Sequence, residues 1–111
     1  MMEPIDYRNE TWESLQARLT GIRMAVWDAW KKYGPGTTRE VSASSGIDIL
    51  TLRPRTTELY QMGFVELVED PIAERQAPPH EGVYRAVSWL TAMQRFHKAK
   101  ANATQRQLQL I

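Results

Sequence analysis

The chain of 111 residues contains no cysteine and no long apolar run. The absence of cysteine excludes a disulfide framework and thiolate chemistry, and it fits a reducing compartment. No apolar stretch approaches the ~20 residues that span a bilayer, and no basic start precedes an apolar run as in a signal peptide. We therefore expect a soluble, cytoplasmic protein without membrane association. Its length predicts one domain that buries a core without disulfides.

Patterns that carry catalysis or bind metals are missing as well. The only histidines are His80 and His97, and neither has a further ligand at metal-binding spacing. Glu66 and Glu69 form a carboxylate pair, but no apolar pocket is indicated around them, as general acid–base catalysis would need. There is no Gly-rich phosphate-binding loop. We expect no enzymatic activity, no cofactor and no metal site.

An excess of charge of one sign is also lacking, because the net charge is +1. A strong binder of duplex DNA usually shows a basic excess, since the phosphates attract Lys and Arg. The charge is nevertheless unevenly distributed. Residues 64–82 carry five carboxylates against one arginine, whereas residues 83–111 carry five basic side chains and no acidic one. We expect the acidic segment to stay away from phosphates.

From Thr11 the sequence has a helical period that Gly34-Pro35-Gly36 ends. This predicts one long N-terminal helix after a flexible N-terminus at residues 1–10. Its apolar stripe consists of Trp12, Leu15, Leu19, Ile22, Val26, Trp30 and Tyr33.

Residues 37–63 are the most informative stretch, because they read as helix, turn and helix. Thr37-x-x-Glu40 is a capping-box pattern that predicts the start of the first helix. Gly46 supplies the turn, and Gly63 ends the second helix.

The second helix of this pair is predicted over about residues 51–62, with Thr51 as its N-cap. In that register Pro54 lies in the first turn, where its missing N–H loses no intrahelical hydrogen bond. Leu52, Thr56 and Leu59 then face the core, and Arg53, Pro54, Thr57 and Gln61 face outward, with Arg55 and Glu58 between the two sides.

The remaining pattern predicts two strands and a last helix. Residues 64–69 and 83–87 are β-prone, and residues 70–82 between them read as a loop. Helical periodicity returns from residue 89 to about residue 101.

The order of elements predicts an α+β, mainly α fold, a winged helix-turn-helix with a three-helix core and a two-stranded wing. It occupies residues 11–88. Residues 89–111 are a C-terminal helix and a candidate dimerisation element.

Three runs carry a resemblance to a known family: Thr-x-Arg-Glu-Val from residue 37, Ser-Gly-Ile-Asp from residue 45, and Thr-Leu-Arg-Pro-Arg-x-x-Glu-Leu-x-x-x-Gly-Phe-Val-Glu from residue 51. The chain resembles winged-helix domains of bacterial and phage regulators, broadly MarR-like. In such domains the segment matching Thr51–Met62 is the recognition helix. The resemblance implies a sequence-specific transcriptional regulator that binds double-stranded DNA as a homodimer.

Seven polar residues are candidates for DNA contact. Arg53 and Arg55 stand at the N-terminal end of the predicted recognition helix, where guanidinium groups suit phosphates and guanine edges. The alternative for Arg55 is an ion pair with Glu58 within the helix. The full set is Thr38, Arg39, Thr51, Arg53, Arg55, Thr57 and Gln61.

Five apolar residues are candidates for dimerisation. Met24 and Trp27 lie off the N-terminal stripe, and they either border a wide core face or form a second apolar face. With Trp89, Met93 and Phe96 of the last helix they are more apolar surface than a small domain needs, which predicts a homodimer.

Two other functions stay open. A winged helix also serves as a protein-interaction module, so an adaptor in a larger assembly is the alternative. A third reading keeps DNA as the partner and assigns the chain to phage replication or packaging.

Overall fold

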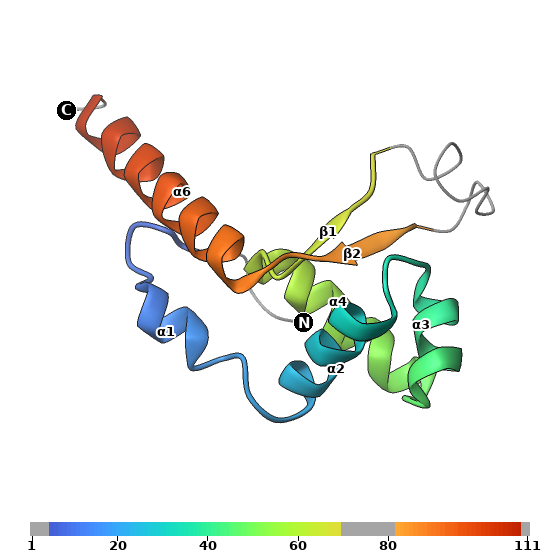
Figure 1. Cartoon of the computed structure of the whole chain (residues 1–111). Coiled ribbons are helices and arrows are strands. Elements are labelled where there is room, and N and C mark those ends of the chain that lie inside the picture. Colours follow the sequence, from blue (N-terminus) through green and yellow to red (C-terminus); the bar gives the residue numbers. More distant parts are fainter. Residues whose placement is uncertain (1–4, 70–81, 110–111) are drawn as a thin grey trace.

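The computed structural model describes residues 5–69 and 82–109, with side chains described up to residue 106 (Figure 1). Within these ranges the fold is α+β and mainly α, as the sequence predicts, with one two-stranded antiparallel sheet. The elements, in chain order, are α1 (Trp12–Gln16), α2 (Gly21–Tyr33), α3 (Thr38–Ser45), α4 (Ile49–Met62), β1 (Val65–Leu67), β2 (Tyr84–Ala86) and α6 (Trp89–Gln109).

The prediction of one long N-terminal helix is wrong, because the chain forms two separate helices there (Figure 1). Thr20 is extended, and Gly21 has a φ of +56°, a left-handed conformation that interrupts a helix and that glycine tolerates. α2 therefore starts in a new direction. The predicted apolar stripe is buried only in part, since Ile22 is 55% exposed and Tyr33 is 40% exposed.

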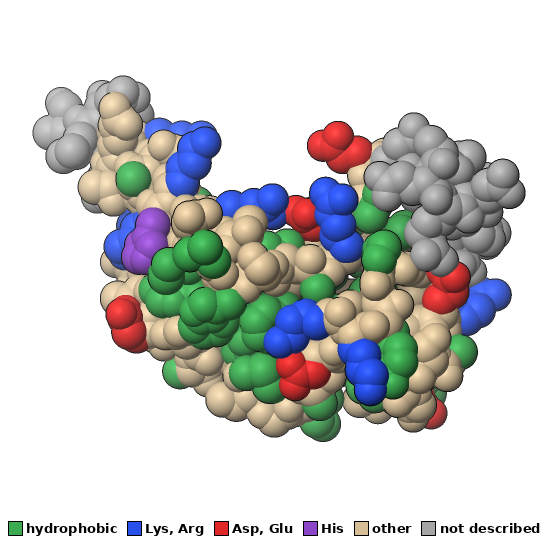
Figure 2. All heavy atoms as spheres, viewed as in Figure 1, with side chains coloured by type: hydrophobic (Ala, Val, Ile, Leu, Met, Phe, Trp, Pro, Cys, Tyr) green, Lys and Arg blue, Asp and Glu red, His purple; other side chains and the backbone are tan. Residues whose placement is uncertain are grey.

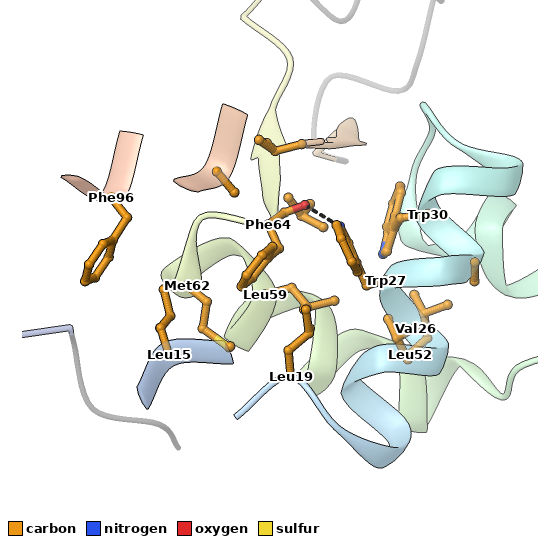
Figure 3. Packing of buried hydrophobic residues seen from close by; sticks show 14 of the residues in the cluster. Leu15, Leu19, Val26, Trp27, Trp30, Leu52, Leu59, Met62, Phe64 and Phe96 are labelled. Atoms are coloured by element: carbon orange, nitrogen blue, oxygen red, sulfur yellow. Dashed lines mark hydrogen bonds between the residues drawn. The ribbon is translucent and has the colours of Figure 1, made fainter. Parts of the chain in front are cut away.

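The core is built around two tryptophans of α2 and Phe64, which precedes β1 (Figure 3). The ring of Trp27 packs edge-on against Phe64, with ring centroids 5.2 Å apart. Both indole N–H groups are satisfied, since Trp27 donates to the Phe64 carbonyl oxygen at 3.1 Å and Trp30 donates to Thr56 Oγ1 at 2.9 Å. An unpaired buried donor costs about 1–3 kcal/mol, so these bonds help to fix α2 against α4 and the start of the sheet.

The helix-turn-helix pattern of residues 37–63 gives two helices, α3 and α4, as predicted. The capping box of α3 is confirmed: Thr37 Oγ1 accepts from the Glu40 amide at 3.1 Å, and the Thr37 amide donates to Glu40 Oε1 at 2.9 Å. Gly46 and Gly63 follow the two helices with φ of +79° and +89°, the left-handed caps that glycine supplies at low cost.

The predicted start of α4 is wrong, because Asp48 and not Thr51 is its N-cap. Asp48 Oδ1 accepts from the Leu50 amide at 2.7 Å, so the helix begins three residues earlier than expected. Pro54 therefore lies inside the helix. Having no N–H, it leaves the Leu50 carbonyl without its usual intrahelical donor, and both residues are exposed, so water can bind that carbonyl.

The two predicted strands pair with each other, in a register that places Val65 opposite Ala86 and Leu67 opposite Tyr84. Tyr84 also forms an isolated bridge with Gly36, with N···O distances of 3.0 and 2.8 Å. This bridge holds the segment that enters α3 beside the sheet. Of the predicted loop at residues 70–82, only Gly82 is among the described residues. His80 lies outside them.

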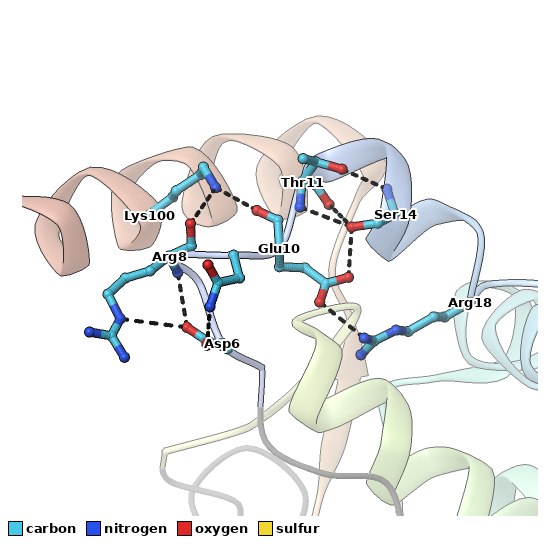
Figure 4. Close-up of polar contacts among 8 residues, drawn as sticks. Asp6, Arg8, Glu10, Thr11, Ser14, Arg18 and Lys100 are labelled. Atoms are coloured by element: carbon cyan, nitrogen blue, oxygen red, sulfur yellow. Dashed lines mark hydrogen bonds and ion pairs between the residues drawn. The ribbon is translucent and has the colours of Figure 1, made fainter.

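The last helix is longer than predicted, and its C-terminal half projects from the body of the molecule (Figure 1). Residues 5–10, which the sequence assigns to a flexible lead-in, lie against α6 from Phe96 to Lys100. Lys100 Nζ donates to the carbonyl oxygens of Tyr7, Arg8 and Glu10 at 3.2, 3.3 and 2.6 Å (Figure 4). The Glu10 carboxylate accepts in turn from Ser14 and Arg18, which ties α1 to the same segment.

No helix in residues 5–69 and 82–109 is long and apolar enough to cross a membrane.

The five residues predicted to form a dimer surface do not all reach the surface. Trp27 and Phe96 are 4% and 3% exposed, so their assignment to an exposed face is wrong. Trp27 lies on the buried side of α2 with Val26 and Trp30. Phe96 packs against Tyr7 and Trp12. Met24 and Met93 are half-buried against the core, and Trp89 is 39% exposed.

Candidate nucleic-acid interface

Helix α4 has a fully buried side and an exposed side. Leu52, Thr56 and Leu59 are at most 2% exposed, because the spacing of four and three residues places them together on the side that meets α2 and α3. The opposite side is exposed at Leu50, Arg53, Pro54 and Thr57. The predicted division into a core face and an outer face is therefore confirmed for these residues, whereas Gln61, predicted on the outer face, is half-buried.

An open pocket of about 270 Å³ lies beside this exposed side. It is bounded by the N-terminal end of α3, the outer part of α4 and the chain that enters β2. Guanidinium and hydroxyl groups on its wall are donors that suit an anion such as a phosphate. The lining residues are Thr37, Thr38, Arg39, Arg53, Thr56, Thr57, Gly82 and Tyr84.

The two arginines of α4 differ in what they contact. Arg53 is exposed and has no ion-pair partner among the described residues. Arg55 is half-buried, and its Nε lies 2.8 Å from Glu58 Oε1. The alternative considered for Arg55, an ion pair within the helix, is the one that forms, so Arg55 is a weaker candidate for DNA contact than Arg53.

Glu58 is held from two helices. Arg23 of α2 donates to it through Nε at 3.0 Å and through a terminal nitrogen at 3.3 Å, in addition to the contact from Arg55. The hydrogen bond from Arg23 is the main cause that lowers the pKa of Glu58, and the charges of Arg23 and Arg55 add to it against the opposing effect of desolvation. This carboxylate therefore stays ionised and neutralises positive charge near α4.

The other predicted residues of the interface fall into two groups. Thr38 and Arg39 start α3 and line the pocket with Arg53 and Thr57, so four of the seven candidates come together. Thr51 is exposed on the first turn of α4 but does not line the pocket. Gln61 is half-buried, and its Oε1 has no hydrogen-bond partner among the described residues.

The basic charge of residues 83–111 is partly cancelled in the folded chain. Arg85 of β2 and Arg95 of α6 both bind the Glu66 carboxylate, the former at 2.7 Å. Burial tends to raise the pKa of Glu66, but the hydrogen bonds and charges of these two arginines outweigh it and lower that pKa. At Glu66 the acidic and the basic segment of the sequence therefore meet in ion pairs and do not form two separate charged surfaces.

The seven candidates predicted from the sequence do not include Leu50, Tyr84 or Thr37, which lie beside the candidate interface. Leu50 belongs to α4 because the helix begins directly after Asp48. The run Gly46-Ile47-Asp48 contained a signal for that start, because Asp is a favoured N-cap residue. Tyr84 lies near α3 because it forms a bridge with Gly36. This contact joins distant segments of the chain, so no local sequence pattern predicts it.

Comparison with protein-family models, with curated proteins and with solved structures found no match. The resemblance to MarR-like regulators therefore stays a hypothesis. Within the described ranges, no three His, Asp or Glu side chains gather as a metal site would require.

Proposed function

We propose that this protein is a winged-helix DNA-binding protein that places the exposed side of α4 in the major groove of double-stranded DNA. The observation that carries the proposal is the division of α4 into a fully buried side and a side that presents Arg53 next to the pocket. An exposed helix face with a guanidinium group near its N-terminal end is what groove recognition by this motif requires.

The arrangement around α4 supports the proposal. Helices α2, α3 and α4 precede a two-stranded antiparallel sheet, which is the element order of a winged helix. The start of α3 brings Thr38 and Arg39 to the same pocket as Arg53 and Thr57. In this proposal Arg53 contacts a base or phosphate, while Thr38 and Arg39 bind the backbone beside it. The biological role that we propose is regulation of transcription in a bacterium or phage.

In this proposal side chains supply the phosphate contacts. At the N-terminus of α4 the Leu50 amide already donates to the Asp48 carboxylate, and at that of α3 the Glu40 amide donates to the Thr37 hydroxyl. This places more weight on Arg53.

The test is a gel-shift titration with duplexes selected from a random-sequence library, at about 50 and about 200 mM salt. Wild-type protein should bind selected duplexes tightly and lose affinity at the higher salt. Arg53→Ala should cost about 1–3 kcal/mol and relax specificity at one position if Arg53 reads a base. If it contacts phosphate only, the loss should be uniform across sequences and the salt slope should fall by about one.

Arg8→Ala is the matched control, because Arg8 is exposed on the N-terminal segment and pairs with exposed Asp6. It should bind DNA like the parent. If Arg53→Ala and Arg55→Ala both stay folded and bind like the parent, α4 is not the DNA-reading helix and the proposal fails.

A protein-interaction module is the second candidate, and two observations favour it. Arg55, Arg85 and Arg95 are neutralised by carboxylates, which weakens the attraction for phosphates. Figure 2 also shows hydrophobic side chains gathered on the surface where α1 and the base of α6 meet. Absence of any DNA shift at low salt would favour this function.

A further inference from the structure

Leu50 is exposed in a way that the fold does not explain. It is the second residue of α4 and is 78% exposed, the largest fraction among the exposed large hydrophobic residues of the described ranges. It lies outside the core cluster. A leucine that stays in water forgoes roughly 1.5–3 kcal/mol of burial, so a contact outside this chain is the natural role to test.

The position of Leu50 relates it to the proposed DNA-reading side chain. Leu50, Arg53, Pro54 and Thr57 recur at spacings of three and four, so they share one face of α4. Leu50 and Arg53 are separated by ~4.5 Å along the helix axis, close to the ~3.4 Å between successive base pairs. The two side chains can therefore reach the same base pair or adjacent ones.

The neighbours of Leu50 favour a nucleic acid over a protein groove. A helix that docks in an apolar groove presents apolar anchors at successive positions i, i+3 or i+4, and i+7. Here positions i+3 and i+7 hold Arg53 and Thr57, and position i+4 holds Pro54, whose ring is apolar but short. The Thr57 hydroxyl donates to the Arg53 carbonyl oxygen at 3.2 Å. The face thus offers one large aliphatic side chain beside one guanidinium group.

The major groove presents the matching pair of chemical groups. The C5 methyl of thymine is its one apolar feature, and the O6 and N7 acceptors of guanine are what arginine binds. We propose that Leu50 is a specificity-determining residue that contacts a thymine methyl, at the base pair contacted by Arg53 or at the adjacent one. This inference rests on the proposed DNA-binding function.

The experiment replaces single thymines of a selected duplex by deoxyuridine, which pairs identically but lacks the methyl group. Wild-type protein should lose about fourfold in affinity at one such position, the factor that corresponds to ~0.8 kcal/mol for one buried methyl group. The Leu50→Ala variant should bind the thymine duplex with an affinity lower than that of wild type by a similar factor. Its affinity should not fall further when that thymine is replaced by deoxyuridine.

Ile22→Ala is the matched control, because Ile22 is an exposed aliphatic residue on α2, at 55% exposure. It should keep the full difference between thymine and deoxyuridine. The deoxyuridine series with wild-type protein needs no variant, so it tests the contact even if Leu50→Ala were to fold poorly.

The two proposals fail in different ways. If wild-type protein selects no sequence from the library, DNA recognition is wrong and the role of Leu50 falls with it. If it selects a sequence but tolerates deoxyuridine everywhere, or if Leu50→Ala keeps the methyl-dependent difference, DNA recognition stands and the role of Leu50 is overturned.

Discussion

Thr56 and Thr57 are adjacent in α4 and carry the same side chain in opposite environments. Thr56 is 2% exposed, and its hydroxyl accepts the indole N–H of Trp30. Thr57 is exposed, and its hydroxyl donates to a backbone carbonyl of its own helix. The hydroxyl is therefore a structural group at one position and a surface group at the next.

We predict that Thr56→Val lowers the free energy of unfolding by about 1–3 kcal/mol, because it keeps the volume but leaves the buried indole N–H without an acceptor. Thr57→Val is the matched control and should change it by less than about 0.5 kcal/mol. Urea denaturation followed by tryptophan fluorescence measures both. Equal effects of the two substitutions would show that the bond between Trp30 and Thr56 contributes no stability.

At the scale of elements, α2 and α4 are joined by packing, by the hydrogen bond from Trp30 to Thr56 and by an ion pair. Arg23 of α2 reaches Glu58 of α4, a residue that is 8% exposed. Because the pKa of Glu58 is lower in the folded state, the pair stabilises the fold above the ordinary glutamate pKa of 4.5. That stabilisation is lost as the pH falls through the lowered pKa of the folded state.

We predict that Glu58→Gln lowers the free energy of unfolding by about 1–3 kcal/mol at neutral pH, as for a hydrogen bond to a charged group. The difference from wild type should shrink at pH values below 4.5. Urea denaturation curves measured over a range of pH give this difference directly, although Glu66 also makes wild-type stability depend on pH.

Glu13→Gln serves as the control for this series, since Glu13 is exposed on α1. It should stay within about 0.5 kcal/mol of wild type throughout. A gap between wild type and Glu58→Gln that stays constant down to acid pH would mean that the Glu58 carboxylate charge does not stabilise the fold.

At the scale of the whole molecule, the apolar surface at the base of α6 is the remaining candidate for self-association. Trp89 is 39% and Leu90 57% exposed, and Met93 is half-buried one turn further on. Met93 is a neighbour of both on the helix surface, four residues after Trp89 and three after Leu90. Trp27 and Phe96 belong to the core, so the predicted dimer contact is smaller than the sequence indicated.

We predict a homodimer at tens of micromolar protein, which corresponds to a Kd of about 1 μM or tighter. Leu90→Glu should convert it to a folded monomer, because the substitution places a charge in an apolar contact. Ile22→Glu, at another exposed aliphatic position, should remain dimeric. Sedimentation equilibrium distinguishes these states, and a wild-type protein that sediments as a monomer would contradict the prediction.

Local chemistry in the sequence determined much of this protein. The Thr37 capping box, the glycines after α3 and α4, and the buried face of α4 follow from interactions within a few residues, so each is visible in the sequence. The two short strands were predicted for the same reason.

Tertiary structure decided what depends on distant contacts or on competing local choices. Asp48 and Thr51 are both good N-caps, and the structure favours Asp48 although this places Pro54 inside the helix. The left-handed Gly21 stands where the predicted N-terminal helix divides in two, and Trp27 of the second helix lies in the core. Arg23 of α2, 35 residues away, shares the Glu58 carboxylate with Arg55. Of the two arginines of α4, Arg53 is therefore the exposed one without such a pair. The sequence held signals for the Asp48 cap and for the pair of Arg55 with Glu58, but it did not decide between the alternatives, because each outcome depends on which partner the folded chain brings near.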